Sequence, residues 1–151
     1  MDFDKDTQVR ILAAAQDRIN GKSPSEENQT IFDIMDMHPE LDEIWKMGEM
    51  AAYPQEVDGM MVNPFVHTVL HLIVDRQIET ESPEYVAETF ARLRDEGMDE
   101  HECLHAIIAV YADLYFSNFR KGGSFSYLDY ETRLLNLSGV KVQEGEEEAG
   151  G

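Results

Sequence analysis

The sequence predicts an all-α, single-domain bundle of six or seven helices. Apolar residues recur at helical spacing in most of the chain, and capping residues, prolines and glycines separate the periodic segments. With 42% hydrophobic residues, 151 residues suffice for one core. We therefore expect one helical domain over residues 1–138. Residues 139–151 are rich in glutamate and glycine, so we expect a disordered acidic tail.

Two helices are expected at the start of the chain. Asp4 or Asp6 can cap a helix that runs to about Ile19, because an aspartate side chain accepts hydrogen bonds from the first backbone amides of a helix. Ser23 is expected to cap the second helix. Pro39 ends that helix, because proline has no amide hydrogen to donate.

A short helix over about residues 39–49 and a loop over residues 51–62 are expected next. His38 precedes the proline that ends the second helix. We expect its ring to cap the helix or to pack against a backbone carbonyl rather than to bind a metal.

The second half of the chain is expected to form four helices, each preceded by a residue that can cap it. They cover approximately residues 65–79, 83–96, 100–120 and 125–137. The expected caps are Asn63, Ser82, Asp99 and either Ser124 or Ser126.

Charge and composition exclude several classes of partner. The net charge of −19 repels nucleic-acid phosphates and anionic lipid, so we expect neither nucleic acid nor a membrane as partner. No apolar run is long enough to span a membrane, and the N-terminus lacks the pattern of a signal peptide. A single cysteine, Cys103, fits a reducing compartment, so we expect a cytoplasmic protein. The sequence identifies neither a partner protein nor an oligomeric state.

Four of the five histidines form two pairs with the same spacing. His67 and His71 stand four residues apart in one expected helix, and His101 and His105 stand four residues apart in another. Residues at this spacing lie on one face of a helix, about one turn apart. Both pairs lie at the edge of an apolar face, so the two pairs could converge on one cavity of the bundle.

Four imidazoles suit a divalent transition metal, with zinc favoured over iron, whereas magnesium prefers oxygen ligands. The sequence therefore predicts a metal site of His67, His71, His101 and His105. Glu102 completes an HExxH string, in which the glutamate activates a water as general base, so metal-assisted hydrolysis is one hypothesis. The same glutamate also lies where a capping box would place it, three residues after Asp99.

A second reading stays open. In it the chain is a non-catalytic interaction or regulatory module, and its histidines are structural, with rings bonded to carbonyls and carboxylates. The sequence does not decide between an enzyme and such a module. It also does not indicate a substrate or a pathway.

The chain resembles a bacterial family of small proteins known only as a domain of unknown function. The resemblance covers about residues 28–137 and includes HPEL at 38–41, NPFVHTVLHLIVDRQ at 63–77 and the HExxH string. The resemblance implies no activity. It indicates only which residues of this chain match the family pattern. The matching residues are Asn63, Pro64, Phe65, His67, His71, Gln77, His101, Glu102 and His105.

Overall fold

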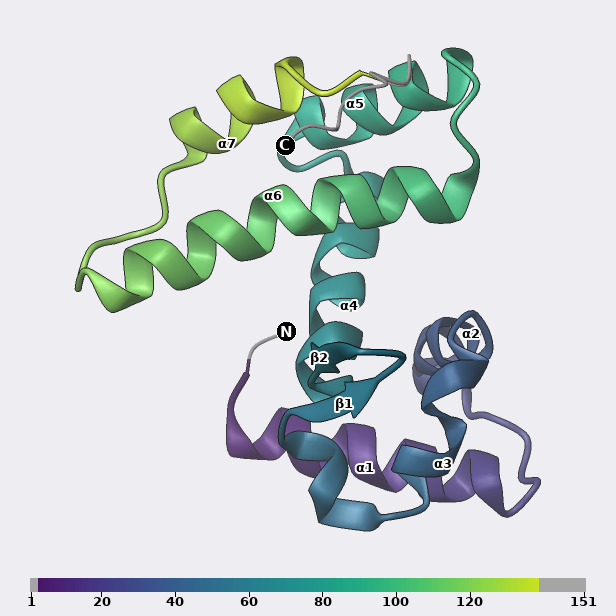
Figure 1. Cartoon of the computed structure of the whole chain (residues 1–151). Helices are drawn as coiled ribbons and strands as arrows, with labels where there is room; N and C mark the ends of the chain where they lie inside the picture. Colours follow the sequence, from purple (N-terminus) through teal and green to yellow (C-terminus); the bar gives the residue numbers. More distant parts are fainter. Residues whose placement is uncertain (1–2, 139–151) are drawn as a thin grey trace. The chain divides into compact units, whose positions relative to one another are not determined.

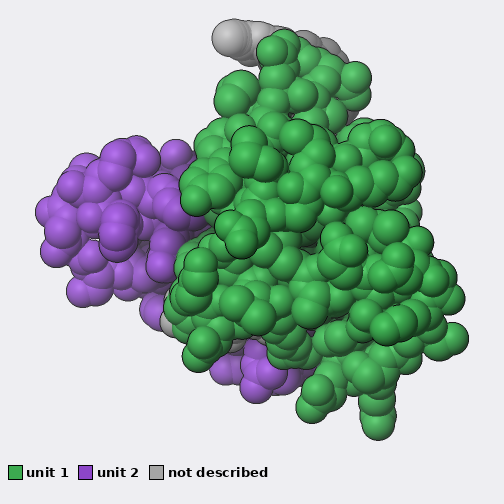
Figure 2. All heavy atoms as spheres, turned by 90° about the horizontal axis from the view of Figure 1, so that it is seen from below, with its two compact units in different colours: residues 1–73 green, residues 74–151 purple. Residues whose placement is uncertain are grey.

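The computed structural model describes residues 3–138 and is mostly helical, as predicted (Figure 1). Within these residues it contains seven α-helices, short 3-10 helices and one two-stranded sheet. The chain divides into two compact units, residues 1–73 and 74–151, and the boundary falls inside helix α4, Pro64–Thr80 (Figure 2). The expected single domain over residues 1–138 stays a prediction. The predicted acidic tail, residues 139–151, lies outside the described residues.

Unit 1 consists of helices, a hairpin and the first part of α4. The α-helices before α4 are α1 (Lys5–Ile19), α2 (Gln29–Asp36) and α3 (Asp42–Trp45). The 3-10 helices are η1 (Glu26–Asn28), η2 (Pro39–Leu41) and η3 (Gly48–Ala52). The strands are β1 (Gln55–Val57) and β2 (Met60–Val62).

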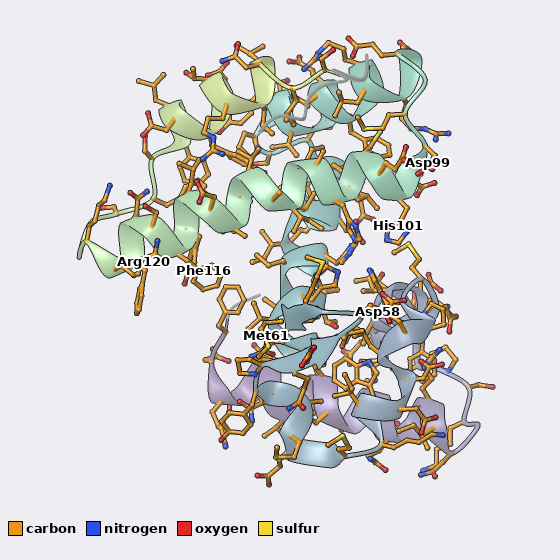
Figure 3. The ribbon with its side chains drawn as sticks, viewed as in Figure 1. Asp58, Met61, Asp99, His101, Phe116 and Arg120 are labelled. Atoms are coloured by element: carbon orange, nitrogen blue, oxygen red, sulfur yellow. The ribbon has the colours of Figure 1, made fainter. Side chains whose placement is uncertain are left out.

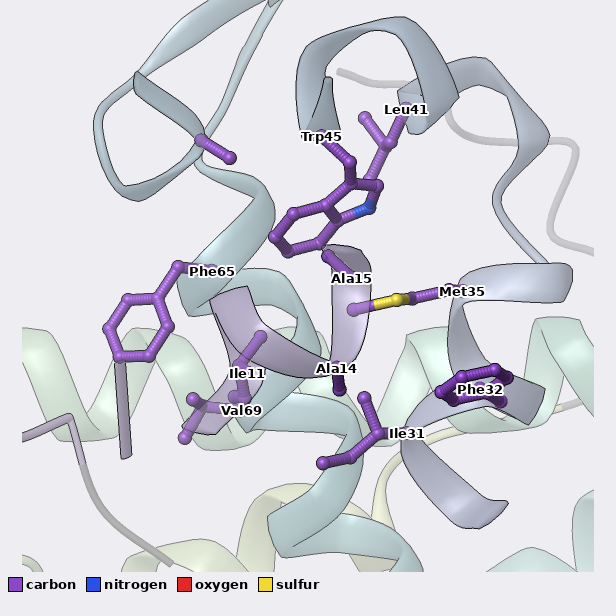
Figure 4. Packing of buried hydrophobic residues seen from close by; sticks show 11 residues of the cluster. Ile11, Ala14, Ala15, Ile31, Phe32, Met35, Leu41, Trp45, Phe65 and Val69 are labelled. Carbon is purple, nitrogen blue, oxygen red and sulfur yellow. The ribbon is translucent and has the colours of Figure 1, made fainter. Parts of the chain in front are cut away.

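The core of unit 1 packs α1, α2 and α3 around the start of α4 (Figure 4). Trp45 is 1% exposed and is among the largest side chains of this core. Phe65 and Val69 bring α4 into the same cluster. The buried members of the cluster are Ile11, Ala14, Ala15, Ile31, Phe32, Met35, Leu41, Trp45, Ala51, Phe65 and Val69.

The predicted first helix is confirmed, whereas the next two differ in detail. Asp4 caps α1 by accepting from the amide of Thr7 at 2.8 Å. The following cap is Ser25 and not Ser23, because Ser25 accepts from the amide of Asn28 and opens η1 ahead of α2. The short helix expected over residues 39–49 is broken, because Gly48 has a φ of 66°, which a right-handed helix does not allow.

The expected loop over residues 51–62 contains a β-hairpin, so that prediction was wrong in part. β1 and β2 pair antiparallel, with Val57 opposite Met60. Asp58 and Gly59 form the turn, and both have positive φ, 52° and 84°. An Asp-Gly pair is a strong hairpin signal, since a type I′ turn needs positive φ at both central residues. Val57 and Val62 pack against the unit 1 core.

Unit 2 packs three helices against one another: α5 (Glu84–Asp95), α6 (Glu100–Arg120) and α7 (Tyr127–Leu135). The predicted cap Ser126 opens α7 by accepting from the amide of Asp129. The predicted cap Ser82 makes no such bond, and Pro83 occupies the N-cap position of α5. Within the described residues, no helix is long and apolar enough to cross a membrane.

Candidate metal centre

His38 lies where α2 ends and η2 begins, and its ring is held by the backbone. Its Nδ1 lies 2.7 Å from the carbonyl oxygen of Ile34, and the residue is 3% exposed. A carbonyl only accepts hydrogen bonds, so Nδ1 carries the proton and donates. The Nε2 of His38 is then left with its lone pair, which is the form in which an imidazole binds a metal. The backbone contact therefore fixes both the orientation and the tautomer of this ring.

His67 and His71 project from one side of α4 toward His38, as their spacing of four residues predicts. The Nε2 atoms of His67 and His38 are 3.0 Å apart. The ring of His71 lies 4.8 Å, centroid to centroid, from the rings of both His38 and His67. His71 is fully buried and His67 is partly exposed. The three imidazoles therefore form one cluster, which we call the His38 cluster.

The spacing of the His38 cluster suits a metal ion. One ring nitrogen from each of its histidines lies within 4.8 Å of the others. Two nitrogens at about 2.0–2.1 Å from a tetrahedral zinc ion are about 3.3 Å apart. The 3.0 Å between the Nε2 atoms of His38 and His67 is close to that value. The three histidines could therefore hold a metal ion.

The predicted pair of unit 2 is also formed. His101 lies in the first turn of α6, close to Asp99 (Figure 3). The Nε2 atoms of His101 and His105 are 3.0 Å apart, and the ring centroids are 4.1 Å apart. Both residues are partly exposed. Each pair thus presents its two rings together, and the predicted role of His101 and His105 as metal ligands stays a prediction.

Glu102 participates in a capping box at the start of α6. Asp99 accepts from the amide of Glu102 at 2.8 Å, and the carboxylate of Glu102 accepts from the amide of Asp99 at 3.4 Å. Glu102 is exposed. The capping interaction accounts for a glutamate at this position. Its predicted role as a general base stays a prediction.

His38 belongs to the cluster, although only a capping or packing role was expected for it. His38 does contact a carbonyl, as expected, but its second nitrogen faces His67, which lies 29 residues further along the chain. No sequence spacing could have predicted that contact. Gln77, which matches the family pattern, accepts at 2.8 Å from the hydroxyl of Tyr130.

Comparison with known families agrees with the predicted resemblance. Residues 4–135 match the model of a family described as a domain of unknown function, DUF1841. The chain belongs to this family. The match covers all five histidines, so the His38 cluster and the pair on α6 both lie inside the DUF1841 region. No curated protein and no solved structure matches the chain.

Proposed function

We propose that this DUF1841 protein binds one divalent transition metal ion at the His38 cluster, with zinc favoured over iron. One observation carries the proposal: the hydrogen bond from His38 to the carbonyl of Ile34 leaves the Nε2 of His38 unprotonated and turned toward the Nε2 of His67. The two Nε2 atoms lie 3.0 Å apart in a largely buried place, close to the spacing that two ligands of one zinc ion require. Imidazole nitrogens bind zinc well, and magnesium or calcium poorly.

The metal would replace a proton in the cluster. Because the Nε2 of His38 accepts, the Nε2 of His67 donates in the contact between them. A metal bound to both nitrogens requires His67 to move that proton to its Nδ1 or to release it. An imidazole that carries a proton on both nitrogens has no lone pair for a metal, so protons are expected to compete with metal binding.

Metal analysis tests the proposal. The full chain, purified without a histidine tag and dialysed against zinc at low concentration, is expected to retain about one equivalent of zinc by mass spectrometry of its metal content. His67→Ala is expected to lose this zinc, and because His67 is only partly buried the variant is expected to stay folded by circular dichroism. A wild-type protein that retains no zinc, or a folded His67→Ala variant that retains it all, would contradict the proposal.

The histidines of unit 2 are tested in the same way. We propose, from the sequence pattern, that His101 and His105 also contribute ligands. If they do, His101→Ala and His105→Ala each weaken zinc binding, as measured by competition with a chromogenic chelator. Unchanged zinc affinity in both variants would restrict the centre to the His38 cluster.

Metal-assisted hydrolysis with Glu102 as general base is the catalytic form of this proposal. Its test is Glu102→Gln, which keeps the size of the side chain and removes the base. Loss of a zinc-dependent hydrolytic activity with zinc content unchanged would support that role. If the protein binds zinc without such an activity, the interaction or regulatory module remains the better description.

A further inference from the structure

We propose that the metal-loaded His38 cluster binds a small anion, such as hydroxide or azide, as an additional ligand. The inference rests on the proposed metal centre and names the ligand class that this centre takes. It follows from the charge of the ligand set, from its burial and from the exposure of one of its rings.

The ligand set leaves the charge of the ion uncompensated. Among residues 3–138, the group of possible ligands at this cluster contains histidines and no carboxylate or thiolate. Imidazole binds a metal as a neutral ligand, so a divalent ion keeps its full charge of +2 after binding. Sites with cysteine or carboxylate ligands, by contrast, neutralise part of this charge within the site. The neutral set therefore favours a ligand that brings negative charge.

Burial strengthens this preference. His71 is 0% exposed and His38 is 3% exposed, so both of these ligands would bind the ion in a place largely removed from water. A buried charge is costly unless an opposite charge pairs with it. An anion in direct contact with the ion supplies that charge. In bulk water the same attraction would be screened and small.

His67 provides the accessible side of the cluster. His67 is partly exposed, whereas His38 and His71 are buried. A ligand from solvent can therefore approach the ion on this side. Hydroxide would come from a water molecule that gives its proton to the solvent, whereas azide would bind as the anion it already is.

The anion must bind through the metal and not through the protein surface. The chain carries 31 acidic residues against 12 lysines and arginines, and its net charge of −19 repels anions at long range. Metal-free protein is therefore expected to bind no azide. This requirement supplies an internal control for the experiment.

The experiment uses the full chain loaded with cobalt(II), because cobalt(II) takes zinc sites and absorbs visible light. Appearance of a cobalt absorption band that saturates at about one equivalent tests the metal centre itself. Azide is then titrated into the loaded protein, and we expect a saturable change of that band. A cobalt band that azide leaves unchanged would overturn the anion inference while the metal centre stands. If no cobalt binds, the proposed function fails first.

A charge variant gives the second measurement. His67→Asp replaces a neutral ligand by an anionic one, so the bound ion keeps one positive charge less. We expect cobalt to bind still and azide affinity to fall about tenfold or more, as loss of one unit of charge at contact distance implies. His67→Gln is the neutral comparison, and at equal cobalt loading we expect it to bind azide about tenfold or more tightly than His67→Asp does. Equal azide affinity in the Asp and Gln variants would contradict the charge argument.

Discussion

At the scale of single residues, His38 is placed by a backbone carbonyl and not by another side chain. Its Nδ1 donates to the carbonyl oxygen of Ile34, four residues earlier, so the ring is held against the end of α2. The second nitrogen then points to a histidine of α4. A local hydrogen bond of this kind orders the ligand before the metal binds. It therefore reduces the conformational entropy that is lost on metal binding.

Tyr130 and Gln77 form a buried hydrogen-bonded pair in unit 2, and one substitution tests this bond. Tyr130 is 0% exposed and donates at 2.8 Å to Gln77. Tyr130→Phe keeps the ring but leaves the Gln77 oxygen without this donor, so we expect a loss of about 1–3 kcal/mol in the free energy of unfolding. Urea denaturation measures it. Tyr53→Phe, at a ring that is 58% exposed, is the control and should leave stability unchanged.

Burial of tyrosine side chains also makes the free energy of unfolding depend on pH in the alkaline range. Burial raises the pKa of Tyr130 well above its ordinary value, and burial, followed by the charge of Glu131, raises the pKa of Tyr85 to about 12. Between the ordinary tyrosine pKa of about 10 and these values, the unfolded chain loses phenol protons that the folded chain keeps. The stabilising effect is therefore complete below pH 10 and decreases as the pH rises. Urea denaturation at a series of alkaline pH values should show the decrease, and Tyr130→Phe should reduce it.

At the scale of elements, the start of α4 positions the His38 cluster. Asn63 caps the helix by accepting from Val66 at 3.0 Å, and its amide donates to the carbonyl of Ala52 at 3.0 Å. The cap thus fixes α4 against η3, one turn before His67. The sequence predicted this cap, because an asparagine followed by proline is a strong helix start.

Removal of that cap should affect both stability and zinc binding. Asn63→Ala removes two hydrogen bonds, and we expect about 2 kcal/mol less free energy of unfolding together with weaker zinc binding. Ser126→Ala, which removes the cap of α7, is the matched control. It should cost about 1 kcal/mol and leave zinc affinity unchanged. Equal zinc affinity in the two variants would mean that the cap does not position the ligands.

Most of the helices have local signals and were predictable, whereas contacts between residues far apart in the sequence were not. Asp4, Asp99 and Ser126 cap helices as expected, because capping needs only the next three residues. The Asp-Gly pair at residues 58–59 is a local signal for a hairpin, but residues 51–62 were expected to form a loop without strands. No feature of the local sequence explains why His38 and His67 face each other. This contact depends on how α2 and α4 pack in the core of unit 1.

At the scale of the whole molecule, a metal that binds only the folded chain stabilises it. Zinc at a hundredfold excess over its dissociation constant should add about 2.7 kcal/mol to the free energy of unfolding. Differential scanning calorimetry with and without zinc measures the effect, and His67→Ala should abolish it. Magnesium, which favours oxygen ligands, should leave the transition in place. An equal shift with both ions would indicate screening of the net charge of −19 and not a specific centre.

The central claim is that imidazole nitrogens of the His38 cluster bind the metal directly. X-ray absorption spectroscopy of the zinc-loaded full chain tests it, because the spectrum reports the ligand atoms themselves. We expect a first shell of nitrogen at about 2.0–2.1 Å, with the outer-shell scattering of imidazole rings. The His67→Ala variant should lose one ring contribution or the metal altogether. A first shell of oxygen alone, or of sulfur at about 2.3 Å, would contradict the claim.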